Sequence, residues 1–452
     1  MQIIVVGCGK VGRSIVAQLS KEDSNNVTVI DTNAQIIRNI STNYDVMGIV
    51  GNGSSFTILD QADLAHADMI IAVTERDEVN LLTCVIAKLN NDKIHTVARV
   101  RSPQYAGELN KLQKGLNLTM TINPEMEAAK EISRLLNFPS AIEIFSFARN
   151  RIDLLRFRVP PISVLVGRSL KDISDLTTNL LVCIIERNSN IMVPNGDTVI
   201  QQGDVLTIIS MPRDAQIFFK KIGVRTNKCK NVMIVGGGQL SFYLSKLLLN
   251  NHVDVTIVEQ DMKRCEELVD ALPGVTVDCG DGTEKELLEE EHLENMDGFV
   301  ACTGLDEVNA ILSLYAMKHV GRKVITKVNH VDFGDVIEGL QLDSIVNPKE
   351  LTAQKIVHYV RAAGNSMESN VETLYKLMNG RVEALEFLLE KESSIIGVKL
   401  VDLKLKPNVL IAGIVRDGKL IIPGGQDEFQ VGDTVIVVTT HLGFREIFDI
   451  LA

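Results

Sequence analysis

The feature that most constrains this fold is an internal repeat that spans the chain. The tetrapeptide Asp-Glu-Val-Asn at residues 77–80 reappears at residues 306–309, an offset of 229 residues. A Gly-Asp pair near the end of each copy, at 203–204 and 432–433, keeps the same offset. A constant offset over such a length indicates duplication of a whole unit rather than two occurrences of a short motif.

Each copy contains two regions with different sequence patterns. In the first region, apolar runs such as Ile3–Val6 and Val27–Ile30 alternate with segments of helical period, which is typical of parallel βαβ units. In the second region, turn signals such as Gln202-Gly203-Asp204 separate short β-branched runs. We therefore predict an α/β fold with two Rossmann-like parallel-sheet domains, each followed by a small β-rich α+β domain. The predicted domains are residues 1–122, 140–223, 230–346 and 369–452.

A connecting helix is predicted inside each copy. Asn123-Pro124 in the first copy and Asn347-Pro348 in the second mark where these helices begin. Proline suits the first position of a helix because the N–H that it lacks would have no partner within the helix.

Composition argues against several classes of function. The 452 residues carry a formal net charge of −12, whereas a general nucleic-acid binder needs a basic surface. The seven cysteines include no Cys-x-x-Cys pair, and no zinc-ligand spacing occurs. No run of apolar residues approaches the roughly 18 that a membrane-spanning helix needs. We predict reduced thiols, no metal site, no nucleic-acid partner and no membrane span.

The N-terminal segment carries a phosphate-binding pattern. The apolar run Ile3–Val6 leads into Gly7, Gly9 and Gly12 with G-x-G-x-x-G spacing, and Asp31 ends the next predicted strand. Gly7 permits a tight turn, Gly9 lets the backbone approach a diphosphate, and Gly12 allows close packing of helix on strand. Asp31 is expected to accept hydrogen bonds from ribose hydroxyls and to repel a 2′-phosphate, which disfavours NADP. The alternative interpretation is a glycine turn needed only for chain reversal.

The matching segment of the second copy departs from this pattern. Gly236 and Gly238 are kept, and Glu259 supplies the acid, but Ser241 stands where the third glycine is expected and Gln239 where the first copy has Lys10. A serine between a closely packed helix and strand should push them apart. The second turn is therefore predicted to bind a nucleotide more weakly or differently, or to stay empty.

Further candidates follow the other predicted strands, because ligands of open parallel sheets lie at the carboxyl ends of strands. Gly51-Asn52 and Gly280-Asp281 could frame an adenine, whereas Arg99 and Lys327 could reach phosphates. Arg99 could equally pair with a neighbouring carboxylate, and Lys10 and Arg13 could simply lie on a solvated helix face. The predicted cofactor-binding residues are Gly7, Cys8, Gly9, Lys10, Val11, Gly12, Arg13, Asp31, Gly51, Asn52, Thr74, Arg99, Gly236, Gly238, Glu259, Gly280, Asp281, Thr303 and Lys327.

Taken together, these motifs resemble a known family. The order of strand, glycine turn, helix and acid, then Ala-Val-Thr-x-x-Asp-Glu-x-Asn at 72–80, then a small domain with Gly-Asp near its end, resembles the RCK/KTN domain pair. The tandem arrangement is similar to the TrkA family of regulatory subunits of Trk-type potassium uptake systems. The resemblance implies a cytoplasmic protein, peripheral on the inner face of the membrane, that binds NAD(H) and ADP or ATP. It also implies a homo-oligomeric ring, a tetramer, docked on a potassium-translocating membrane subunit.

Two rival functions stay open at this point. An NAD-dependent dehydrogenase would need an acid–base residue beside the nicotinamide, and residues 141–223 contain no histidine, while only His441 falls in the last 80 residues. A nucleotide-sensing subunit of some other transporter would differ only in its partner. We predict a regulatory protein with no catalytic residues.

Overall fold

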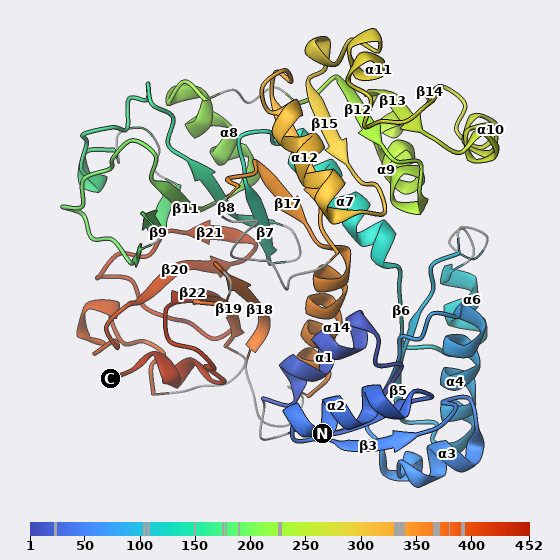
Figure 1. Ribbon diagram of the computed structural model, residues 1–452. Coiled ribbons are helices and arrows are strands. Elements are labelled where there is room, and N and C mark those ends of the chain that lie inside the picture. Colours follow the sequence, from blue (N-terminus) through green and yellow to red (C-terminus); the bar gives the residue numbers. More distant parts are fainter. Residues whose placement is uncertain are drawn as a thin grey trace.

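The computed structural model describes residues 1–21, 25–102, 105, 109–148, 151–173, 176, 179–188, 190–224, 228–329, 340–364, 371–378, 380–389 and 394–452 (Figure 1). The repeat appears as two parallel and two antiparallel sheets that alternate along the chain. No helix among these residues combines the length and the apolarity required to cross a bilayer.

The two parallel sheets have the same strand order. The first runs β3-β2-β1-β4-β5-β6 and the second β14-β13-β12-β15-β16-β17. In both, the order reverses beside the first strand, which leaves a crevice at the carboxyl ends of the strands. The first sheet consists of β1 (Gln2–Val6), β2 (Asn26–Asp31), β3 (Met47–Val50), β4 (Met69–Ala72), β5 (His95–Arg99) and β6 (Met120–Ile122). The second consists of β12 (Asn231–Val235), β13 (Asp254–Glu259), β14 (Thr276–Cys279), β15 (Gly298–Ala301), β16 (Lys323–Lys327) and β17 (Ser344–Val346).

Helices cover both faces of each parallel sheet because their apolar residues recur at helical spacing. On α1, for example, Val11, Ile15 and Leu19 are buried against the first sheet. The helices of the first sheet are α1 (Lys10–Leu19), α2 (Ala34–Asn43), α3 (Phe56–Gln61), α4 (Asp77–Asn90) and α6 (Leu109–Gly115). Those of the second are α9 (Gln239–Asn250), α10 (Met262–Ala271), α11 (Lys285–Glu290) and α12 (Asp306–Ala316).

The antiparallel sheets also match each other, and they pack together. Their orders are β10-β9-β11-β8-β7 and β18-β19-β22-β20-β21, with α8 (Pro212–Lys221) beside the first. One apolar core joins them, and the hydroxyl of Tyr375 donates to the carbonyl of Ser146 at 2.9 Å. Their strands are β7 (Glu143–Phe147), β8 (Ile152–Arg158), β9 (Leu180–Arg187), β10 (Asn190–Met192), β11 (Val205–Ser210), β18 (Val371–Leu377), β19 (Val382–Leu388), β20 (Val409–Arg416), β21 (Lys419–Ile421) and β22 (Thr434–Thr439).

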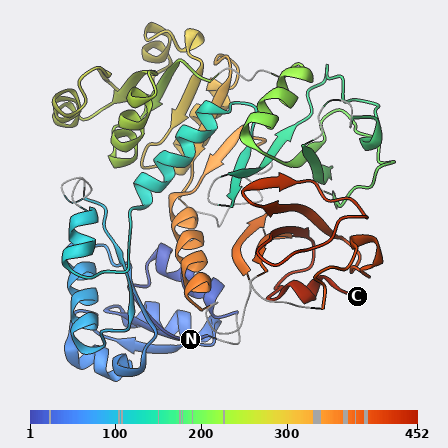
Figure 2. The ribbon, with the colours of Figure 1, turned by 180° about the vertical axis from the view of Figure 1, so that it is seen from behind.

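The two proline-initiated helices are confirmed, and each packs on the opposite half of the chain. Helix α7 (Pro124–Asn137) follows the first parallel sheet but lies against α9 of the second, where Ile132 and Leu136 join its core. Helix α14 (Pro348–Gly364) follows the second sheet but lies against α1 of the first, where Ile356 and Val360 join its core. Figures 1 and 2 show both exchanges, cyan α7 beside α9 and orange α14 beside α1. We call α7 and α14 the crossed helices.

Candidate functional site

Both glycine turns open onto one cleft of about 1560 Å³ that lies between the halves. The lining includes most of the residues predicted from the sequence, and these come from both halves. They are Gly7, Gly9, Lys10, Val11, Asp31, Gly51, Asn52, Thr74, Arg99, Gly236, Gly238, Glu259, Gly280, Asp281, Thr303 and Lys327. Cys8, Gly12 and Arg13, which we also predicted as cofactor-binding residues, lie outside this lining.

The first glycine turn is built as its residue types require. Gly7 has a φ of 92°, a left-handed conformation that side chains disfavour. A Cβ on Gly12 would lie 2.0 Å from the carbonyl oxygen of Gly7, so α1 can approach the turn this closely only with glycine there. A Cβ on Gly9 would meet nothing within 4 Å, because this glycine faces open space.

In each half the predicted ribose-binding acid also braces the turn. Asp31 Oδ2 accepts the backbone N–H of Cys8 at 2.7 Å, and Glu259 Oε2 accepts that of Gly237 at 2.6 Å. A carboxylate offers about four lone-pair directions, so these bonds leave capacity for ribose hydroxyls. The Cys8 side chain itself is buried, and burial raises the pKa of its thiol to about 12. Cys8 therefore contributes a backbone N–H and neutral packing.

The second turn accommodates its serine through a hydrogen bond. The hydroxyl of Ser241 is fully buried, donates to the carbonyl of Gly236, and lies 3.0 Å from Cys302 Sγ. Gly236 keeps the left-handed conformation, with a φ of 102°. The backbone turn therefore survives the substitution, and α9 is tied to it by a side chain where α1 makes direct contact.

The Asp-Glu-Val-Asn repeat holds the strand ends at the cleft. Asn80 is fully buried, accepts the backbone N–H of Thr74 at 2.8 Å, and donates to the carbonyl of Arg99 at 2.9 Å. Asn309 makes the matching bonds to Thr303 and Lys327, at 2.8 and 3.0 Å. These asparagines join the end of the fourth strand to the end of the fifth in each half. They therefore hold in place the backbone of two segments that line the cleft.

Both basic residues at the fifth-strand ends lie over carbonyl groups. Lys327 Nζ donates to the carbonyl of Thr303 at 2.9 Å, and Arg99 Nη1 lies 3.4 Å from that of Thr74. Arg99 Nε is buried and has no hydrogen-bond partner among the described residues. Burial lowers the pKa of Arg99, with the nearby Arg101 as a further cause. This guanidinium has an unused donor at the edge of the cleft.

The two turn helices are suited to a diphosphate. Neither α1 nor α9 has a side-chain cap on its first N–H groups, because Gly9 and Gly238 occupy the N-cap positions. Uncapped N–H groups at a helix N-terminus, beside a glycine that faces open space, form a common phosphate-binding arrangement. The residues present therefore fit a nucleotide diphosphate at both turns.

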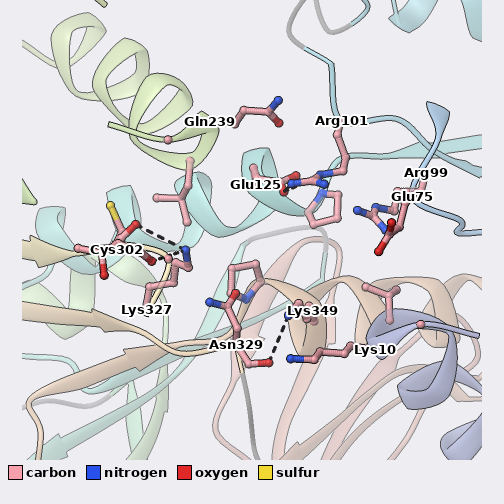
Figure 3. A pocket seen from close by; sticks show the side chains of 18 of the residues that line it. Lys10, Glu75, Arg99, Arg101, Glu125, Gln239, Cys302, Lys327, Asn329 and Lys349 are labelled. Carbon is pink, nitrogen blue, oxygen red and sulfur yellow. Dashed lines mark hydrogen bonds and ion pairs between the residues drawn. The ribbon is translucent and has the colours of Figure 1, made fainter. Parts of the chain in front are cut away.

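The cleft lining also includes residues that we had not predicted as cofactor-binding, namely Lys349, Asn329, Glu125, Arg101 and Gln239 (Figure 3). Lys10, Lys349 and Asn329 gather near the first turn, whereas Gln239, Glu125 and Arg101 gather on the other side. Lys349 Nζ lies 3.5 Å from the carbonyl of Asn329, and Arg101 Nε donates to Glu125 Oε1 at 2.8 Å. Glu125 and Lys349 are the second residues of the crossed helices, and each follows Asn-Pro. Aligning the two copies at Asn-Pro shows that these residues correspond, but it does not show that they line the cleft.

Two family models match the chain. The TrkA-N domain matches residues 3–124 and 232–348, and the TrkA-C domain matches residues 154–223 and 384–452. The chain is 31% identical to the Trk system potassium uptake protein TrkA homolog 1 of Methanosarcina mazei, over 99% of both chains. It is also 31% identical to the Trk system potassium uptake protein TrkA of Halomonas elongata, over 97% of this chain and 95% of that one.

Solved structures share the fold at low sequence identity. The GsuK channel bound to NAD has a TM-score of 0.61 and 14% identity, over 97% of this chain and 76% of that one. The GsuK RCK domain has a TM-score of 0.60 and 14% identity, over 97% of this chain and 92% of that one. GsuK bound to ADP has a TM-score of 0.50 and 12% identity, over 81% of this chain and 70% of that one. The fold of two parallel sheets, each followed by an antiparallel sheet, is thus that of tandem RCK domains.

Proposed function

This chain belongs to the TrkA family, and on that premise we propose that it is a nucleotide-binding regulatory subunit that gates a Trk-type membrane potassium transporter. The observation that carries the proposal is the single cleft between the halves, onto which both glycine turns open. A ligand in this cleft touches both halves, so its binding energy can change how they are held together.

The proposed ligands are NAD(H) and ADP or ATP. Uncapped α1 and α9, each beside an acid that ends the second strand of its half, fit a diphosphate next to a ribose. Two neighbours of the same fold, the GsuK structures bound to NAD and to ADP, support both classes of nucleotide. In this proposal the glycine turns bind the phosphates, and Asp31 and Glu259 bind ribose hydroxyls.

Gating is proposed to follow from a change in the angle between the halves. A ligand shifts a conformational equilibrium only by its differential affinity for the two states, and couplings of about 1–3 kcal/mol are typical. A homo-oligomeric ring, proposed as a tetramer on the inner face of the membrane, would transmit the change to the potassium-translocating subunit. The predicted segments 1–122, 140–223, 230–346 and 369–452 are the proposed domains, and no catalytic step is assigned to them.

Flux through the cognate transporter in proteoliposomes tests the proposal. We expect NADH or ATP to alter potassium flux only when this protein is present, and to alter the small-angle scattering profile of the purified protein. Unchanged flux and scattering at saturating nucleotide would disprove gating. Sustained oxidation of NADH with any member of a panel of carbonyl substrates would show an enzyme instead.

A further inference from the structure

The crossed helices bring residues of opposite charge to the two glycine turns. Lys349, at the start of α14 in the second half, lines the cleft beside Lys10 of the first turn. The corresponding residue on α7 is Glu125, which lies on the side of Gln239 and the second turn. Where the first turn has two ammonium groups, the second turn therefore has an amide and a carboxylate.

Lys349 is partly buried beside a second positive charge. Burial, and then the neighbouring ammonium of Lys10, lower the pKa of Lys349 to about 8. Asp306, the carboxylate whose charge opposes this shift, accepts hydrogen bonds from the backbone and side chain of Asn329. Two like charges so close together are unfavourable unless an anion lies between or beside them.

The backbone N–H groups at the start of α14 are not available to bind an anion. Asn347 Oδ1 accepts the N–H groups of Lys349 and Glu350, at 3.0 and 3.1 Å. The helix start is thus already capped, and the group that α14 presents to the cleft is the Lys349 ammonium.

The other side of the cleft presents hydrogen-bond acceptors. Glu125 Oε2 and Gln239 Oε1 are buried and have no hydrogen-bond partner among the described residues. The guanidinium of Arg101 is already paired with Glu125. Hydroxyl or amide donors of a ligand would satisfy these two acceptors, whereas the oxygens of an ionised terminal phosphate carry no hydrogen to donate to them.

We propose that Lys349 acts across the halves as a specificity residue, forming with Lys10 a clamp for the terminal phosphates of a nucleoside di- or triphosphate at the first glycine turn. The inference rests on the proposed function and deepens it. The second turn, with Glu125 and Gln239, then accepts a ligand without terminal phosphates, such as a dinucleotide. The first turn then selects nucleotides with terminal phosphates, and the second turn selects nucleotides without them.

Peptide-level hydrogen exchange on the full-length protein separates the two turns. Protection of residues 2–19 and of 231–250 would be titrated with ATP and with NADH. Lys349→Gln should raise the ATP concentration that half-protects the first turn about 10-fold, which corresponds to about 1.4 kcal/mol of binding free energy. The NADH concentration that half-protects either turn should change much less. Lys349→Arg keeps the charge and should restore most of the ATP affinity.

Lys355→Gln is the matched control, since it removes one positive charge from the same helix where it pairs with Glu127 outside the cleft lining. Equal ATP affinities for wild type, Lys349→Gln and Lys355→Gln would overturn the clamp while leaving nucleotide binding intact. An equal loss of ATP and NADH affinity in Lys349→Gln would overturn its role in discrimination. Absence of any nucleotide protection in the wild type would defeat the proposed function and the clamp with it.

Discussion

The two glycine turns have nearly the same backbone but different surroundings. Gly7 and Gly236 share a left-handed conformation, and an acid braces each turn through a backbone N–H. In the first half the helix touches the turn directly because residue 12 is glycine, whereas in the second half Ser241 inserts a hydroxyl. The two copies have thus kept the backbone of the turn, whereas the side chains around it have diverged. Mutations in the crossed helices and in the turns should separate the two halves, and those in the crossed helices should have the strongest effect.

The crossed helices make each half depend on the other for its core. Ile356, fully buried on α14, packs in the core of the first parallel sheet, and Ile132 on α7 packs in the core that includes the second. Ile356→Ala should cost about 2–5 kcal/mol of stability and accelerate hydrogen exchange in β1 and α1, although the mutation lies in the second half. Ile132→Ala should cost a similar amount of stability and accelerate hydrogen exchange in β12 and α9, although this mutation lies in the first half. Faster exchange confined to the half that carries each mutation would contradict the exchange of helices.

Gly12→Ala tests the direct contact between α1 and its turn. The added Cβ would lie 2.0 Å from the carbonyl oxygen of Gly7, and such overpacking costs about 1–3 kcal/mol. We expect a lower unfolding midpoint and loss of nucleotide protection at residues 2–19. Ser241→Gly is the reciprocal change and should leave both the midpoint and binding at the second turn nearly unaltered. If Gly12→Ala also left the unfolding midpoint and nucleotide protection unchanged, the proposed difference between the turns would be wrong.

Asp31→Asn tests the ribose assignment with little change in volume. The amide keeps one acceptor oxygen and introduces a donor where the carboxylate accepts the N–H groups of Cys8 and Asn33. Affinity for nucleotide at the first turn should fall about 10-fold, in line with the loss of a charge-assisted hydrogen bond. Glu259→Gln should produce the corresponding loss at the second turn alone. Calorimetric titration of the two variants would reveal whether one acid affects both turns.

The smallest expected effect is a pH dependence confined to the first turn. Lys349 has a pKa lowered to about 8 by burial and by Lys10, and Asp306 and Lys327 also act on it. A phosphate binds the protonated ammonium, so ATP affinity should be full well below pH 8 and should decline as the pH rises through that value. We expect a decline of a few-fold between pH 7 and pH 9 in the wild type and a flatter profile in Lys349→Gln. A profile that is unchanged by the substitution would assign the titration to another group.

Much of the fold and part of the site could be predicted from the sequence. The strand and helix periods, the glycine spacing and the position of Asp31 are local signals, and the rule that ligands lie at the carboxyl ends of strands placed Thr74, Arg99 and Lys327 at the cleft. The sequence could not show which half a connecting helix packs on, because both halves offer similar apolar faces. Lys349 and Glu125 were missed for this reason. Their positions in the cleft depend on contacts between segments more than 100 residues apart in the sequence.

Placement of the glycine-turn residues was predictable only in part. Gly12 was correctly interpreted as a packing position, but it lies outside the cleft lining together with Cys8 and Arg13. Spacing identifies the turn, whereas the orientation of each side chain depends on how α1 rotates against the sheet. Cys8 shows the distinction most clearly, since its N–H serves the turn while its thiol is buried in the core.

The crossed helices also bear on how such a protein can evolve. Two identical subunits exchanging one helix would present the same residue at both turns, so a lysine gained at one would be gained at the other. Joining the two copies in one polypeptide removes that symmetry. Position 349 can then change independently of position 125. A protein that responds to one metabolite can in this way become a protein that responds to the relative amounts of two.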